Sequence, residues 1–185
     1  MKLVAIAVAS WLAAGPAWGH TFPPNRTVVA QVEACELVVM VGYRPGSGEA
    51  TQTILARAAN SPKSHEVESL RDVLGTTAMA PLTVAIDGHA LVPTSVRAKI
   101  GVEPGGARPM VVVLVTYSLA PGHTLAISSA DSRNTRISWQ DRASRRVDLV
   151  GAPTQDHWFD GVASFLLKLS PSWGPSACAI PSSQR

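Results

Sequence analysis

Short runs of aliphatic and β-branched residues, separated by turn-forming residues, constrain the fold of this chain more than any other feature. Such runs are typical of strands, and about eight to ten of them at roughly ten-residue spacing predict a mainly β fold, an antiparallel Ig-like β-sandwich. The most hydrophobic run, 110–117 (MVVVLVTY), is expected to be a central strand. The run 82–86 (LTVAI) leads into Asp87-Gly88, a signal for a tight hairpin turn.

One segment departs from the strand pattern. Between about residues 49 and 75 the apolar residues fall three and four apart, as on one face of an amphipathic helix. A first helix is expected to end at Asn60, before Ser61-Pro62, and a second to start after the N-cap Ser64 and stop at Gly75. We therefore expect a helical hairpin inserted into the sandwich.

The C-terminal third contains two further runs, 135–139 (TRISW) and 145–150 (RRVDLV), which are expected to pair as a hairpin. Residues 157–169 are expected to form a strand or a short helix. Arginines gather around the hairpin, where they either protect a solvent-facing edge or form a patch for an acidic partner or a glycan. These arginines are Arg133, Arg136, Arg142, Arg145 and Arg146.

The first 19 residues have the three parts of a cleavable secretory signal. Lys2 supplies the positive charge, residues 3–14 are apolar, and Ala17 and Gly19 are the small residues before a cut after Gly19. The apolar stretch is too short to span a bilayer, which takes about 20 residues. The sequence therefore predicts a periplasmic or secreted protein whose mature chain begins at His20.

Length and charge limit the domain organisation of the chain and the classes of partner that it can bind. Residues 20–170 are expected to form a single sandwich domain, and the proline-containing residues 171–185 an irregular tail. The 16 Lys and Arg nearly balance the 13 Asp and Glu, so the charge does not favour binding to nucleic acid or to an anionic membrane surface. No later apolar run is long enough to cross a bilayer, so the mature chain is expected to have no membrane span.

The two cysteines, Cys35 and Cys178, are an even number in a chain with an export signal. This combination predicts a disulfide between an early strand and the C-terminal tail. The alternative is two free thiols.

Few residues are candidates for chemistry. After cleavage His20 would carry a free α-amine beside its imidazole, two nitrogens that suit copper, although the remaining histidines are scattered. The alternative is that His20 merely follows the cut. The loop 42–51 lacks the Lys-Ser or Lys-Thr of a phosphate-binding loop, and 161–165 (GVASF) does not match a nucleophile elbow. The sequence predicts no catalytic residue and no cofactor, with copper as the alternative.

Three tryptophans remain after cleavage, and they either pack in the core or present their faces to a sugar or a peptide. They are Trp139, Trp158 and Trp173. Together these features favour an exported, non-enzymatic β-sandwich that binds an unknown protein or glycan at the cell envelope. A periplasmic copper-binding protein that uses His20 is the second hypothesis.

A series of short strings follows the order found in one known family. They are His20-Thr21, 70–74 (LRDVL), 82–88 (LTVAIDG), 91–93 (LVP), the strand around Trp139, and 157–159 (HWF). In this order the chain resembles the extracytoplasmic β-rich domain that precedes the membrane helices in large HupE/UreJ-like proteins, a family named for hydrogenase and urease accessory nickel permeases. The sequence has no counterpart of the membrane part, so nickel transport and its residues are not carried over. The resemblance implies a bacterial periplasmic or cell-surface sandwich.

Overall fold

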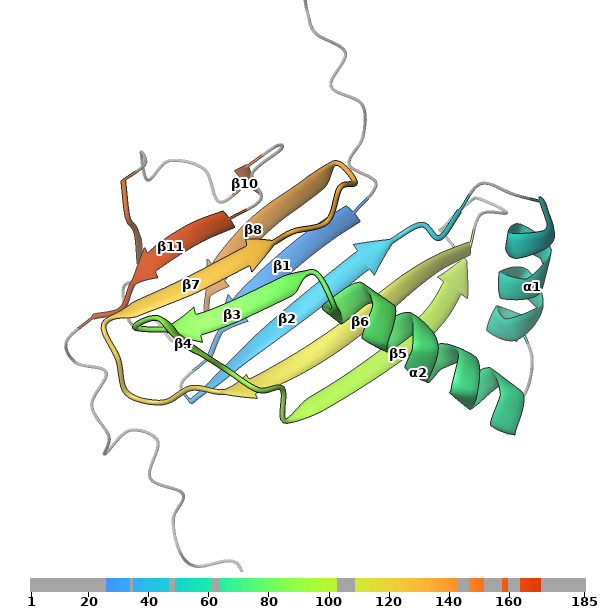
Figure 1. Ribbon diagram of the computed structural model, residues 1–185, viewed down its shortest axis with the longest axis horizontal. Helices are drawn as coiled ribbons and strands as arrows, with labels where there is room; N and C mark the ends of the chain where they lie inside the picture. The colour runs from blue at the N-terminus through green and yellow to red at the C-terminus, as the bar shows by residue number, and fades with distance from the viewer. Residues whose placement is uncertain are drawn as a thin grey trace, which may run out of the picture.

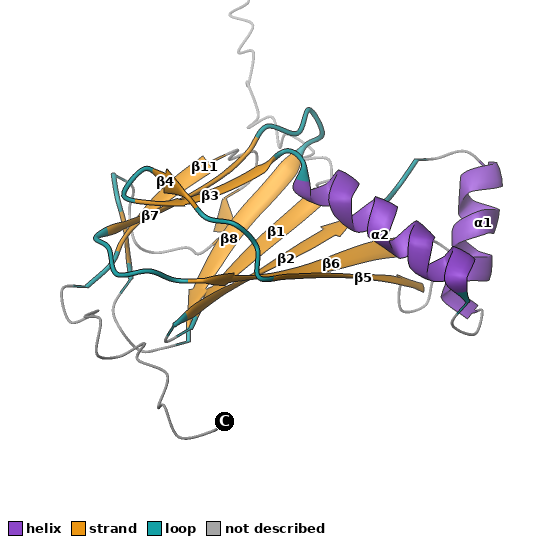
Figure 2. Ribbon diagram, turned by 60° about the horizontal axis from the view of Figure 1, so that its bottom comes forward, coloured by secondary structure: helices purple, strands orange, loops and turns teal. Residues whose placement is uncertain are grey.

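The computed structural model describes most of the chain between residues 26 and 170. The described ranges are 26–33, 35–46, 49–60, 64–102, 109–142, 147–151, 158–159 and 164–170. Within them two β-sheets lie face to face as two layers, and two helices are inserted between strands β2 and β3 (Figures 1 and 2). The predicted mainly β fold with a helical insertion is confirmed.

The larger sheet has six strands and the smaller sheet five. In spatial order the larger sheet consists of β10 (Trp158–Phe159), β8 (Thr135–Asp141), β1 (Arg26–Val32), β2 (Glu36–Tyr43), β6 (Pro109–Ser118) and β5 (Ser95–Val102). The smaller sheet consists of β4 (His89–Ala90), β3 (Leu82–Ile86), β7 (Thr124–Ser129), β11 (Ser164–Lys168) and β9 (Asp148–Leu149). As predicted, the most hydrophobic strand, β6, has a neighbour on both sides.

The core lies between the sheets and follows from the period-two pattern of the strands. Alternate residues of β1, such as Val28 and Ala30, are fully buried, and they belong to one cluster with Ile127 of β7 and Leu167 of β11. Burying each aliphatic side chain of this size contributes about 1.5–3 kcal/mol, so this shared core holds the two sheets together.

The helices extend the second layer beyond the smaller sheet. Helices α1 (Glu49–Asn60) and α2 (His65–Met79) both lie over β5 and β6 (Figure 2). Leu55 and Ala58 of α1 pack on Ile100 of β5 in a small separate cluster. Part of the larger sheet is therefore covered by helices rather than by a second sheet.

Helix α2 does not stop at Gly75, as the sequence predicted, but continues to Met79. Gly75 is buried, and a Cβ atom at this position would lie 3.4 Å from Cγ1 of Val96 on β5. The glycine therefore lets the helix approach the sheet closely and does not act as a C-cap. The helix ends two residues before Pro81, whose ring does not fit a helix interior.

The expected hairpin of 135–139 with 145–150 is wrong. Strand β8 pairs in parallel with β1, whereas β9 pairs with β11 in the other sheet. A solvent-facing hairpin needs one polar, exposed face, but neighbouring residues of β8 are buried on both faces: Ile137 is 0%, Ser138 2% and Trp139 8% exposed. Every other strand pairing in the described ranges is antiparallel.

The turn predicted at Asp87-Gly88 joins β3 to β4, with positive φ angles of 47° and 82°. The Asp87 carboxylate also accepts hydrogen bonds from the backbone N–H groups of His123 (3.0 Å) and Thr124 (2.8 Å). These bonds and one from the Thr124 hydroxyl lower the pKa of Asp87 to about 2. The hairpin is thereby fastened to the connection between β6 and β7.

Several sequence-based predictions fall on residues that the structure does not describe. The signal (1–19), His20, Cys178 and the tail (171–185) lie outside the described ranges. Cys35 lies in the turn between β1 and β2, and the bridge to Cys178 stays a prediction. Neither helix of the described ranges combines the length and the apolar character needed to cross a membrane.

Candidate binding pocket and the polar network behind it

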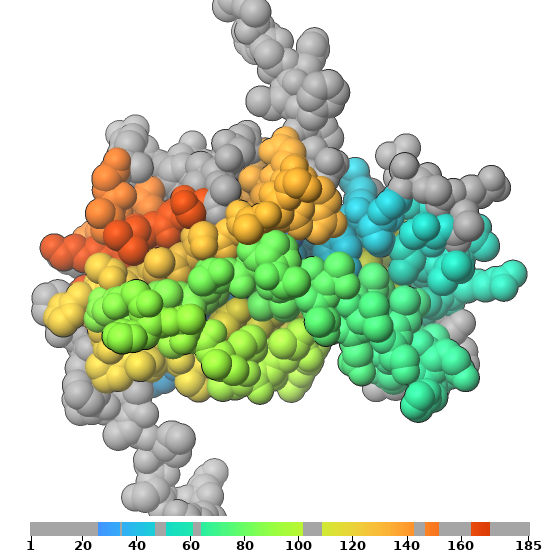
Figure 3. All heavy atoms as spheres, viewed as in Figure 1, coloured from blue at the N-terminus to red at the C-terminus, as the bar shows by residue number. Residues whose placement is uncertain are grey.

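A pocket of about 480 Å³ lies beside α2, on the side of the sandwich where the edge strands β4 and β5 are joined by residues 91–94. Figure 3 shows this face of the molecule, on which α2, β3 and β4 lie over the larger sheet. The size is typical of a site for a small molecule. The pocket is lined by Thr76, Met79, Ala80, Leu82, Thr83, Val84, Ala90, Leu91, Pro93, Val96 and Tyr117.

The pocket walls are apolar because core-facing positions of three strands meet there. Val84 of β3 and Tyr117 of β6 come from facing sheets, and each is only 2% exposed. Val96 of β5 is 45% exposed, which places it toward the opening. None of the described residues that line this pocket carries a charge.

The link between β4 and β5 is held in place by backbone hydrogen bonds. Leu91 N–H donates to the Val84 carbonyl at 2.8 Å, and Thr94 N–H donates to the Thr116 carbonyl at 2.7 Å. These bonds anchor the link to both sheets at the positions where Leu91 and Pro93 line the pocket.

Tyr117 brings a polar atom to this apolar wall. No hydrogen bond from its hydroxyl to another described residue is present, and the oxygen is not one of the fully enclosed, unpaired polar atoms of the described ranges. The oxygen therefore keeps some accessible surface, and Tyr117 is one of the residues that line the pocket. Burial raises the pKa of Tyr117 to about 12, so the phenol keeps its proton at neutral pH.

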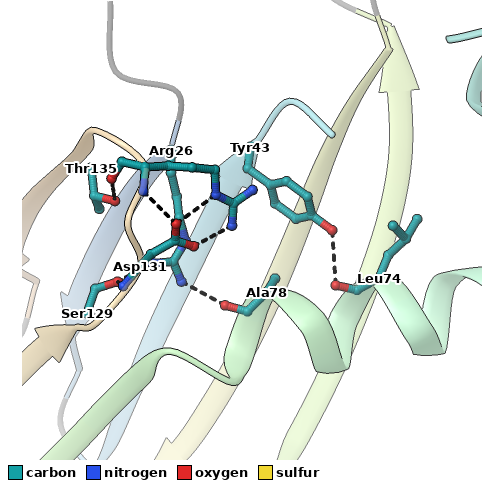
Figure 4. A network of polar contacts seen from close by, with 8 residues as sticks. Arg26, Tyr43, Leu74, Ala78, Ser129, Asp131 and Thr135 are labelled. Carbon is teal, nitrogen blue, oxygen red and sulfur yellow. Dashed lines mark hydrogen bonds and ion pairs between the residues drawn. The ribbon is translucent and has the colours of Figure 1, made fainter. Parts of the chain in front are cut away.

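Behind the pocket, a buried arginine fixes the helical wall. Arg26, at the start of β1, is fully buried, and its Nη2 donates to the Ala78 carbonyl of α2 at 2.7 Å. Its Nη1 donates to the Ser129 hydroxyl at the end of β7 (Figure 4). The Tyr43 hydroxyl of β2 donates to the Leu74 carbonyl at 3.1 Å. The C-terminal half of α2, which supplies one pocket wall, is thus tied to the larger sheet at two points.

Asp131 balances the buried charge. Its Oδ2 lies 3.7 Å from Nε of Arg26, and it forms a closer pair with Arg133. The Arg133 backbone N–H and Nε donate to Oδ1 at 2.9 and 2.8 Å. The guanidinium of Arg133 lies 5.1 Å from the centre of the Tyr43 ring, a cation–π distance. The network joins β1, β2, α2 and the connection from β7 to β8.

The network leads us to expect a loss of stability in acid. The hydrogen bonds from Arg133, helped by the charge of Arg26, lower the pKa of Asp131 to about 2 in the folded protein. A carboxylate whose folded pKa is depressed stabilises the fold above its unfolded pKa, near 4, and loses this contribution as the pH falls toward 2. We expect about 2 kcal/mol of unfolding free energy to be lost across this window. Urea unfolding at several pH values measures it, and Asp131→Asn should show a correspondingly smaller acid dependence.

The structure assigns different places to the residues that the sequence singled out. His65, His89 and His123 are exposed, and no group of three or more potential metal ligands occurs within the described ranges. Because His20 lies outside these ranges, copper binding stays a prediction. Trp139 is 8% exposed and belongs to the core. Trp173 and the side chain of Trp158 are not described.

The predicted arginine group does not form the face of a hairpin. Arg133 pairs with Asp131, Arg136 lies half-buried on β8, and Arg142 is exposed after β8. Arg145 and Arg146 lie outside the described ranges. The buried Arg26 was not predicted from the sequence as a site residue. The sequence indicates the burial of Arg26 only through its position two residues before Val28, which puts both residues on the inward face of β1.

Comparison of the chain with protein-family models, with curated proteins and with solved structures found no significant match. The resemblance to the extracytoplasmic domain of HupE/UreJ-like proteins therefore stays a sequence-based expectation.

Proposed function

We propose that this protein is an exported, non-enzymatic binding module of the cell envelope, and that the pocket beside α2 binds a small apolar ligand. The observation that carries the proposal is the pocket itself, whose described lining residues are mostly apolar and carry no charge. A concave, apolar site with few polar groups is the usual form of a small-molecule site. Export rests on the signal-like residues 1–19.

The chemistry of the lining favours an apolar ligand over a glycan. Sugar rings are commonly bound on the exposed faces of aromatic side chains, together with polar groups. The aromatic residue of this pocket, Tyr117, is only 2% exposed and offers no open face. An apolar molecule would instead gain free energy from every part of the wall that it covers.

The proposal is tested by titrating the exported protein with the apolar fluorescent probe N-phenyl-1-naphthylamine. Ala90 lines the pocket and is exposed, so Ala90→Trp should fill the opening without disturbing the core. We expect saturable binding by the wild-type protein and at least about tenfold weaker binding by Ala90→Trp, because the indole occupies the volume that the probe needs.

Val92→Trp is the matched control. Val92 lies two residues further along the same segment, is 82% exposed and does not line the pocket. This variant should bind the probe like the wild-type protein, and both variants should keep the wild-type unfolding temperature. The proposal fails if the wild-type protein does not bind the probe, or if the two tryptophan variants bind it equally.

A further inference from the structure

The polar side chains that line the pocket differ in how deeply they are buried. Thr76 and Thr83 also line it, but both residues are exposed and their hydroxyls can be hydrated. Tyr117 is 2% exposed, but its hydroxyl oxygen keeps some accessible surface, and no hydrogen bond joins it to another described residue. Because the hydroxyl oxygen of Tyr117 keeps some accessible surface, it can be hydrated in the free protein. A ligand that covers this oxygen removes its hydration, and an acceptor atom on the ligand restores a hydrogen bond.

We infer that the ligand of this pocket is an uncharged apolar molecule with a hydrogen-bond acceptor, such as a ketone or an ester, and that the Tyr117 hydroxyl donates to this acceptor. The inference rests on the proposed function, because it names the class of ligand for the same pocket. It makes Tyr117 the residue that determines specificity, while the apolar wall supplies most of the contact area.

The direction of the hydrogen bond follows from the protonation state of the Tyr117 phenol. Because burial raises its pKa to about 12, Tyr117 is protonated at neutral pH and can act as a donor. A carbonyl oxygen is a suitable acceptor and carries no charge.

The charge of the ligand follows from the lining. A carboxylate that entered the pocket would lose its hydration, and none of the described residues that line the pocket is a lysine, arginine or histidine that could compensate. Burial of an unpaired ion is far more costly than burial of a carbonyl group that accepts a hydrogen bond. The pocket should therefore discriminate against fatty acid anions of the same chain length.

The inference is tested by displacement of N-phenyl-1-naphthylamine with three competitors of similar size at about pH 7. They are 2-decanone, undecane and decanoate. In Tyr117→Phe we expect the affinity for 2-decanone to fall at least about fivefold, because its carbonyl oxygen would be buried without a donor. The affinity for undecane, and for the probe, should stay within about twofold of wild type. Decanoate should bind the wild-type protein at least about tenfold more weakly than 2-decanone does.

Ser138→Ala is the control, since it removes a buried hydroxyl from β8, a strand that contributes no residue to the described lining of the pocket. It should keep the wild-type affinity for 2-decanone, for undecane and for the probe. If the probe binds and Tyr117→Phe leaves the ketone affinity unchanged, or if decanoate binds as tightly as the ketone, the inference is wrong while the proposed function stands. If the wild-type protein does not bind the probe, both are wrong.

Discussion

Replacement of Asp131 with asparagine is expected to lower the free energy of unfolding by at least about 3 kcal/mol. Arg26 is fully buried and forms its ion pair with Asp131, and a guanidinium does not lose its proton in a protein. The substitution would leave this cation without its counter-charge. It would also turn a carboxamide NH₂ toward the donors of Arg133, which bond the carboxylate oxygens in the wild-type protein. Urea unfolding followed by circular dichroism at neutral pH measures the change.

Two variants separate this effect from a general effect of charge. Asp72→Asn removes an exposed carboxylate from α2 and should change the free energy of unfolding by no more than about 0.5 kcal/mol. The double variant Arg26→Met/Asp131→Asn should cost less than the sum of its single substitutions, because the unpaired cation is then absent. Strictly additive costs would show that the Arg26–Asp131 pair does not stabilise the fold in the way that its geometry indicates.

Among the glycines that the structure describes, Gly122 is expected to tolerate alanine least, with a cost of about 2–3 kcal/mol. A Cβ atom at this position would lie 2.2 Å from Cγ2 of Ile86 and 2.9 Å from Oδ2 of Asp87. Ile86 is 4% exposed and packed in the core, so it cannot move away. The same shift would disturb the hydrogen bonds that Asp87 accepts from the β6–β7 connection. Thermal and urea unfolding measure the cost.

Gly101→Ala is the control for this substitution. Gly101 lies on β5, and a Cβ atom there would meet nothing within 4 Å, so we expect a change of no more than about 0.5 kcal/mol. In the double variant Gly122→Ala/Ile86→Ala the space opened at Ile86 should accommodate the new methyl group, and the cost should be less than the sum of the two. Equal costs for Gly122→Ala and Gly101→Ala would contradict the steric explanation.

The local elements could be predicted where one physical signal dominates. Strand β6 is an uninterrupted β-branched and aliphatic run, and the turn at Asp87-Gly88 carries the residues that tolerate positive φ. Helix α1 ends at Asn60, as the sequence before Pro62 indicates. Each of these signals acts between residues close in the chain, and the tertiary contacts of these elements agree with it.

Two predictions were wrong, the helix end at Gly75 and the hairpin of 135–139 with 145–150. In both segments the structure depends on residues that are distant in the chain. Glycine is a common residue at the end of a helix, but the small size of Gly75 instead allows α2 to pack closely on Val96. Residues 135–141 have the pattern of a hairpin strand, but their burial on both faces comes from their place beside β1. In both cases the intrinsic preference of the local sequence for one secondary structure contributes about 1 kcal/mol or less to the free energy of folding. Burial against a distant element contributes more.

The amino-acid sequence by itself determined the mainly β class, the position of the helical insertion and the tight turn, because these depend on side-chain period and backbone preference within a few residues. Only the tertiary structure decided that Arg26, Ser129, Asp131 and Ala78 meet, and that Tyr117 lines a pocket with residues of α2 and β3. Arg26 and Ser129, for example, are 103 positions apart along the chain. Their juxtaposition depends on how the sheets and α2 pack, which no local pattern in the sequence encodes.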